Sequence, residues 1–357
     1  MNATHLDRTF EHTTLGSTGQ QVGRLGVSAS YGVPAKAVER AFDAGVNYFY
    51  WGSMRRAQFA QAIRNLSAQR DRLVLVIQSY SRIAGLMSWS LERALRELRL
   101  DRADVLLLGL WGKPVPERIL NAARRLKERG LVRFVAISSH NRPLIGRWVS
   151  SGEFDVIHFR YNAIHNGAES DIFPRLPRQN GPGMVCYTAT SWKQLMDPKR
   201  VPKGEKVPTA GDCYRFVLTR PEIDVCITGP ANAAQMDHAV EALRKGPMSD
   251  DELAWMRKGG PSHLWQGAVR DCGIGIPACA FCGAGVTDPR SILGFCLPPP
   301  TRYSCASFHS SYQAIWMASS LPSFDPFGSS PNFSSSVTHL CKSVKRTFNG
   351  STSGNFS

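Results

Sequence analysis

Two patterns of apolar residues alternate along most of the chain. Short apolar runs bounded by turn residues are typical of buried strands, whereas apolar residues spaced three or four apart are typical of helices that cover them. The predicted strands are 25–30, 46–50, 73–79, 105–111, 132–138, 156–161, 184–188 and 225–228. The predicted helices are 34–44, 55–66, 87–98, 116–130, 210–218 and 233–243, followed by a short helix capped by Ser249.

Eight strands that alternate with helices predict a parallel sheet closed into a (β/α)8 TIM barrel. A turn at 15–19 predicts a hairpin in front of this barrel. A doubly wound open sheet is the alternative fold, but it normally carries a glycine-rich phosphate loop after its first strand. Residues 28–32, which read Ser-Ala-Ser-Tyr-Gly, do not form such a loop.

The composition changes after about residue 260. Residues 301–357 hold 16 serines and show no sustained period. We therefore expect a barrel over 13–260 and a Cys/Ser-rich irregular or disordered tail over 261–357. Four cysteines of the tail lack the paired spacing of zinc sites and the usual run of iron–sulfur sites, so no metal site is expected. They are Cys272, Cys279, Cys282 and Cys296.

The chain carries a net charge of +15, which favours anionic ligands or partners without naming one. Its basic clusters read as solvated helix faces, because no nucleic-acid motif with stacking aromatics accompanies them. No apolar run reaches the length of a membrane span, and the polar N-terminus is not a secretory signal. Three scattered cysteines before residue 270 fit a reducing compartment. We expect a cytoplasmic protein without nucleic-acid or membrane partners.

Four stretches of the predicted barrel occur in a specific order, at 14–19, 44–49, 131–138 and 227–235. In that order they resemble the opening hairpin, second strand, fifth strand and cofactor phosphate loop of the aldo/keto reductase superfamily. Its members are NADPH-dependent barrels that reduce carbonyl compounds. The resemblance covers residues of about 13 to 258, and it implies a nicotinamide cofactor and a small-molecule carbonyl substrate.

The resemblance also implies four catalytic positions, and this chain departs from the family at each. The family uses an Asp, a Tyr, a Lys and a His, of which the Tyr donates a proton to the carbonyl oxygen. Here the Asp position matches Tyr50 and the Tyr position falls near Arg55. The Lys and His positions match Gln78 and Gly109, neither of which carries a charge. The family mechanism therefore cannot operate here as it stands.

The residues at the mouth of the predicted barrel, where the strands end, have two interpretations. The first is catalysis by residues other than those of the family. Tyr48 and Tyr50 are two apart on one strand and so share a face, with Tyr50 nearer the mouth. Together with His140 and Arg160, Tyr50 could polarise and protonate a carbonyl oxygen. The other reading is that the tyrosines fill the barrel and that the histidines, including His158, are satisfied structural groups.

Cofactor binding is predicted at the loops after the fifth, seventh and eighth strands. Ser138 and Ser139 match the pair that holds the nicotinamide amide in the family, and Tyr187 matches the aromatic residue that stacks on the ring. Gly229, Asn232 and Gln235 lead into a helix whose N-terminus can bind phosphate. The alternative for this last loop is an ordinary strand–helix turn.

The cofactor is NADPH or NADH, because Ala231 stands where a cation often reads the 2′-phosphate. The sequence thus predicts an aldo/keto-reductase-like oxidoreductase that binds NAD(P)H and reduces a carbonyl through a non-standard proton donor. The alternative is a non-catalytic cofactor- or ligand-binding barrel with a regulatory role.

Overall fold

The computed structural model describes residues 10, 12–52, 56–79 and 81–258. The predicted tail over 261–357, its cysteines and the position near Arg55 lie outside the described residues. Among the described residues, no helix has both the length and the apolar character needed to cross a membrane.

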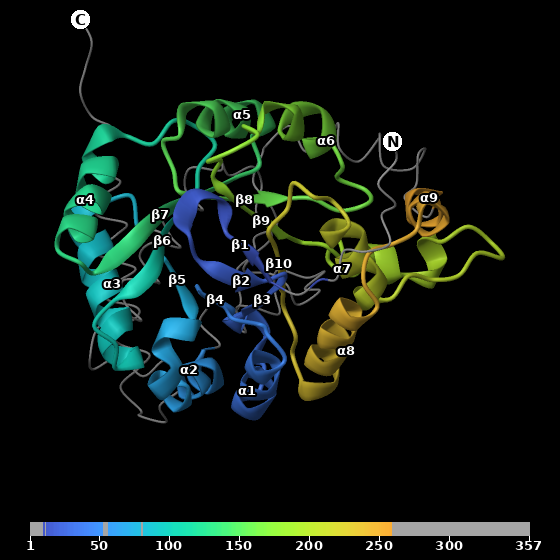
Figure 1. The fold of residues 1–357 in the computed structure, drawn as a ribbon, viewed down its shortest axis with the longest axis horizontal. Coiled ribbons are helices and arrows are strands. Elements are labelled where there is room, and N and C mark those ends of the chain that lie inside the picture. Colours follow the sequence, from blue (N-terminus) through green and yellow to red (C-terminus); the bar gives the residue numbers. More distant parts are fainter. Residues whose placement is uncertain (1–9, 11, 53–55, 80, 259–357) are drawn as a thin grey trace, which may run out of the picture. The chain divides into compact units, whose positions relative to one another are not determined.

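Eight parallel strands form a closed barrel in the order β10-β3-β4-β5-β6-β7-β8-β9 (Figure 1). The strands are β3 (Leu25–Ser28), β4 (Tyr48–Trp51), β5 (Val74–Gln78), β6 (Ala103–Leu110), β7 (Val132–Ser139), β8 (Val156–Arg160), β9 (Gly183–Tyr187) and β10 (Val225–Thr228). Each pairs in parallel with its neighbours, and β10 pairs with β3 to close the ring. The predicted TIM barrel is confirmed.

The predicted N-terminal hairpin is also confirmed. Strands β1 (His12–Thr14) and β2 (Gln21–Gly23) pair antiparallel. Leu15 and Val22 from this hairpin are fully buried and belong to the same apolar cluster as the inward side chains of the barrel strands. The hairpin therefore closes the amino-terminal end of the barrel and leaves the carboxyl ends of the strands as the open mouth.

Helices surround the strands (Figure 1). They are α1 (Ala35–Asp43), α2 (Ala57–Asn65), α3 (Ala84–Leu98), α4 (Glu117–Glu128), α5 (Arg142–Ser151), α6 (Ala168–Asp171), α7 (Ala210–Leu218), α8 (Ala233–Arg244) and α9 (Asp250–Lys258). Helix α5 was not expected from periodicity, although Asn141 caps its start and Gly152 ends it at a φ of 66°. The capping box expected at Ser249 and Glu252 is present, with each side chain accepting from the backbone N–H of the other residue.

Strand β4 alternates between two apolar environments. Tyr48 and Tyr50 pack with the cluster inside the barrel, whereas Phe49 and Trp51 face the surrounding helices. Their inward and outward alternation confirms that the two tyrosines share a face.

Strand β4 starts at Tyr48, two residues later than predicted, because Asn47 has another role. Its side-chain amide nitrogen donates to the carbonyls of Gln21 and Arg72, and its amide oxygen accepts from the Gly23 N–H at 2.8 Å. Asn47 thus ties the hairpin to the base of the barrel.

Candidate functional site

The inward side chains at the carboxyl ends of the strands form the rim of the mouth. This rim includes Tyr50 on β4, Gln78 on β5, Ser138 on β7, Arg160 on β8 and Tyr187 on β9. The register pairs Arg160 with Tyr187 on neighbouring strands. All of the side chains that face a TIM-barrel mouth are in position to meet a ligand there.

One layer below the rim, Tyr48 and His158 form a buried pair. The Tyr48 hydroxyl and His158 Nε2 are 2.8 Å apart, and both side chains are almost completely buried. Burial lowers the pKa of His158 to about 3 and raises the pKa of Tyr48 well above its usual value. His158 is therefore a neutral, satisfied structural group, as the structural reading of the histidines had it.

Tyr50 stands above this pair, half-buried at the end of β4. Its hydroxyl donates to Gln78 Oε1 on the neighbouring strand, and its ring centroid lies 6.3 Å from that of His158. Gln78 is a neutral amide and places no charge beside this phenol. The structure thus places the Tyr50 hydroxyl at the mouth, bonded to the Gln78 side chain.

Four of the predicted residues come together on the other side of the mouth. Ser138 Oγ and the Tyr187 hydroxyl are 3.2 Å apart, and the His140 ring meets the Tyr187 ring edge-on at 5.8 Å. Burial raises the pKa of Tyr187 to about 12, against the opposing effects of Ser138 and Arg160. Burial, and then the charge of Arg160, lowers the pKa of His140 to about 4. His140 is therefore neutral near pH 7, and its Nδ1 is buried without a hydrogen-bond partner in the described part of the chain.

The loops after β8 and β9 add two residues that the sequence analysis missed, His165 and Trp192. The guanidinium carbon of Arg160 lies 5.8 Å from the ring centroid of Trp192, and His165 meets the same ring edge-on. Burial, followed by the charges of Arg160, His140 and Arg142, lowers the pKa of His165 to about 4. The sequence signal that could have identified them is the presence of aromatic and imidazole side chains in loops that follow barrel strands.

Ser139 is not brought to the mouth with Ser138. It is fully buried, its hydroxyl donates to the Trp111 carbonyl at 2.6 Å, and the same oxygen accepts from the Asn141 N–H at 3.0 Å. Successive residues on a strand face opposite sides, which separates the two serines. Ser139 would have to give up both bonds to hold a cofactor amide.

The loop after β10 is largely satisfied by its own residues. Asn232 Oδ1 accepts from the Gln235 N–H at 2.9 Å and caps α8, while Gln235 Oε1 accepts from the Ala231 N–H at 2.8 Å. At Gly229 a Cβ would lie 2.4 Å from the Tyr31 ring, so glycine is required for this close approach. The loop therefore presents a short backbone surface against an aromatic ring, next to the N-terminus of α8.

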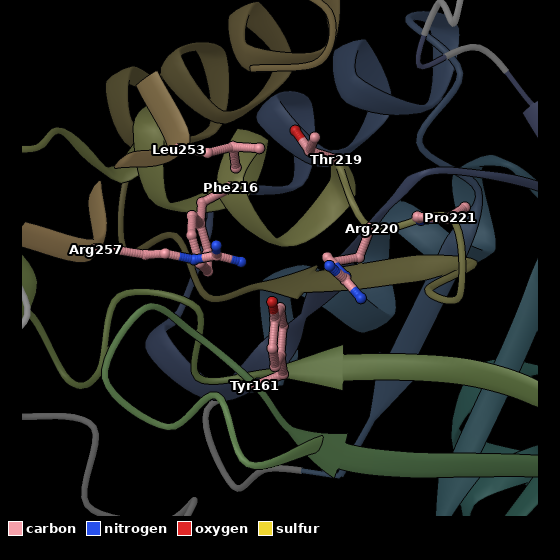
Figure 2. Close-up of a pocket in the computed structure, with 7 residues that line it drawn as sticks. All are labelled: Tyr161, Phe216, Thr219, Arg220, Pro221, Leu253 and Arg257. Atoms are coloured by element: carbon pink, nitrogen blue, oxygen red, sulfur yellow. The ribbon is translucent and has the colours of Figure 1, made fainter. Parts of the chain in front are cut away.

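A cavity of about 60 Å³ lies on the outer side of the barrel. Figure 2 shows the side chains around it. It is lined by Tyr161, Phe216, Thr219, Arg220, Pro221, Leu253 and Arg257. Most of its polar groups have partners, since Glu169 accepts from both the Tyr161 hydroxyl and Arg257, and Arg220 pairs with Glu222. Arg220 Nε is buried without a hydrogen-bond partner among the described residues.

The chain was compared with known families and structures. The aldo/keto reductase family matches residues 22–192, which run from β2 through β9. The matched residues, just under half of the chain, are similar to the aldo/keto reductase family. A search of curated proteins found no match.

Solved aldo/keto reductases share the fold of the chain. An aldo-keto reductase from Bacillus halodurans in its holo form has 17% identity and a TM-score of 0.57, over 71% of this chain and 97% of its own. An aldo/keto reductase from Klebsiella pneumoniae, solved with NADP and acetate, has 20% identity and a TM-score of 0.58, over 70% and 96%. At these identities the likeness concerns the fold alone.

The structure gives a reason for one position at which this chain departs from the aldo/keto reductase pattern. Gly109 adopts a φ of 80° within an irregularity of the β6–β7 pairing. A residue with a side chain is strained in that conformation, so a histidine would not fit there without backbone change. The backbone at Gly109 therefore favours glycine over histidine at this position of the mouth.

Proposed function

We propose that this protein is an aldo/keto reductase that binds a reduced nicotinamide cofactor and reduces a small-molecule carbonyl compound, with Tyr50 as the proton donor. The observation that carries the proposal is the cluster of Ser138, His140, Arg160 and Tyr187 on one side of the mouth, facing Tyr50 on β4. The cluster combines an aromatic ring, a hydroxyl and the orphaned His140 Nδ1.

These residues fit a nicotinamide. Tyr187 offers a ring face for stacking, and Ser138 and His140 Nδ1 offer hydrogen-bonding atoms for the carboxamide. The loop at Gly229 and the N-terminus of α8 are suited to the phosphates. When bound, the reduced nicotinamide supplies a hydride to the carbonyl carbon. Tyr50 then delivers the proton that the carbonyl oxygen needs.

Cofactor binding is tested by titrating the full chain with NADPH and NADH and following intrinsic fluorescence and thermal stability. Tyr187→Ala should weaken binding roughly two- to tenfold, which is what the loss of an aromatic contact typically costs. Tyr187→Phe is the matched control, because it keeps the ring and removes the hydroxyl. The proposal fails if wild type shows no response to either cofactor at millimolar concentration.

Turnover is tested by cofactor oxidation with a panel of aldehydes and quinones. Tyr50→Phe should lower kcat by roughly 10²–10⁴, the usual value of a positioned general acid. His140→Ala should act mainly on cofactor affinity, because His140 contacts Tyr187. Robust turnover that neither substitution changes would move the chemistry elsewhere in the mouth.

A second candidate is a ligand-binding barrel without catalysis. Gln78 and Gly109 favour it, since neither supplies the charge that tunes the proton donor in the family. Clear cofactor binding with no oxidation of the cofactor by any substrate would support this second candidate over the first.

A further inference from the structure

Arg82 lies in the loop after β5 and reaches the end of the next strand, β6. Its Nη2 donates to the Leu110 carbonyl, and its guanidinium carbon lies 3.6 Å from the centroid of the Trp111 ring. A guanidinium stacked on an indole and anchored at one nitrogen has a fixed orientation. The loop thus holds a cation in one place at the carboxyl ends of two adjacent strands.

The remaining terminal nitrogen of Arg82 is unused. Nη1 is buried and has no hydrogen-bond partner among the described residues, and Arg82 forms no ion pair with a carboxylate there. Burial lowers the pKa of Arg82 to about 10, which still leaves it protonated near pH 7. A buried charged donor without an acceptor is costly, so such a group calls for a functional explanation.

The two strand ends beside Arg82 carry uncharged residues. Strand β5 ends in Gln78, which accepts the Tyr50 hydroxyl, and β6 carries Gly109 in its irregular stretch. Neither Gln78 nor Gly109 brings a charge. Arg82, four residues beyond Gln78 and bonded to the end of β6, brings a positive charge to these two strand ends.

We propose that Arg82 binds the carbonyl oxygen of the substrate through Nη1 and stabilises the negative charge that develops on it. This inference rests on the proposed reductase function. When the carbonyl carbon accepts the hydride with its electron pair, the C–O π bond opens and the oxygen becomes an alkoxide. The Tyr50 hydroxyl transfers its proton to that oxygen, and the phenolate regains a proton from solvent. Nη2 already donates to the Leu110 carbonyl. Nη1 is therefore the terminal nitrogen that remains for the substrate, and it would bind a single oxygen atom.

The first test uses acetate as a probe, since its carboxylate oxygens are anionic acceptors, as an alkoxide oxygen is. Acetate is added to the full chain without cofactor, against chloride at equal ionic strength, and thermal stability is followed. A ligand that binds the native state raises the melting temperature. Wild type should show a saturable rise, Arg82→Ala should lose it, and Arg82→Lys should recover part of it.

Arg93→Ala is the matched control for the acetate test. The Arg93 guanidinium lies 5.5 Å from the centroid of the Trp89 ring on α3, so it forms another arginine–tryptophan pair, away from the strand ends. This variant should keep the full response to acetate. An equal acetate response in Arg82→Ala and wild type would overturn the proposal.

The second test is kinetic. Arg82→Ala should lower kcat by roughly 10²–10³, the usual effect of removing an oxyanion donor, and leave the cofactor Kd unchanged. Loss of the acetate response with unchanged kcat would refute the charge-stabilising role. If wild type turns over no substrate, the proposed reductase function fails, while loss of the acetate response in Arg82→Ala would still support oxygen binding by Arg82.

Discussion

Replacing His158 should change how the stability of the protein depends on pH. His158 is only 2% exposed, is held by Tyr48 at 2.8 Å and has a pKa of about 3 in the folded state, against 6.5 for an unperturbed histidine. Between these two pKa values the unfolded chain binds a proton that the native state does not. Stability contributed by His158 is therefore fully present above pH 6.5 and is lost as the pH falls towards 3.

The size of this effect follows from the pKa difference. Between pH 7 and pH 5, proton binding to the unfolded state costs about 2 kcal/mol of unfolding free energy through His158 alone. His140 and His165, each with a pKa of about 4, act in the same direction. Asp224 acts in the opposite direction, because burial raises its pKa to about 6 and its contribution falls as the pH rises towards 6. These groups remain in a His158 variant, so their contributions cancel in the comparison.

The assay is urea unfolding of wild type and His158→Gln at pH 7 and pH 5, followed by circular dichroism. Glutamine can still accept from Tyr48 but does not titrate. On acidification, His158→Gln should therefore lose about 2 kcal/mol less unfolding free energy than wild type does. His238→Gln, at an exposed position on α8, is the control and should behave as wild type does. Identical pH dependence in wild type and His158→Gln would refute the reasoning.

Two further predictions concern contacts that position parts of the barrel. Arg215→Ala should destabilise the protein by about 2–3 kcal/mol in urea unfolding, because Arg215 is buried and forms a two-point ion pair with Glu252 on α9. The exposed pair of Arg244 with Glu241 provides the control, and Arg244→Ala should change stability by less than about 0.5 kcal/mol. Gly229→Ala should weaken NADPH binding, because the added methyl group would push the Tyr31 ring out of place. Adding Tyr31→Ala to this variant should relieve the clash. Equal NADPH affinity in Gly229→Ala and wild type would contradict this interpretation.

The barrel could be predicted from the sequence because its signals are local. Alternating strands and helices predicted the closed sheet, and the spacing of Tyr48 and Tyr50 predicted their shared inward face. Strand ends were less predictable, because they depend on side chains such as Asn47, whose hydrogen-bond partners come from distant segments. Helix α5 carried a readable Asn cap and a glycine end, but its apolar spacing gave no sustained helical signal.

The candidate site was predictable where residues sit on strands and less so where they sit on loops. Ser138, Arg160 and Tyr187 are placed by strand register, and the structure brings them to one rim. Arg82 and Trp111 come from loops after different strands, so no spacing in the sequence predicts their stacking. Ser139 shows that a match to a family position is not enough to predict a role. Its hydroxyl already bonds to the backbone of Trp111 and Asn141, which the match did not reveal.

The layers of the barrel suggest how a changed set of rim residues can remain functional. Tyr48 is fixed to His158 in the lower layer, so it is not available to a substrate, whereas Tyr50 in the upper layer donates to the neutral Gln78. A proton donor at this position needs a nearby positive charge to favour its ionised form, and neither Gln78 nor Gly109 supplies one. Arg82 is anchored to the adjacent strand end and retains an unused donor. The proton donor and the charge that supports the oxygen would therefore come from a strand and a loop, so Tyr50→Phe and Arg82→Ala test the two roles separately.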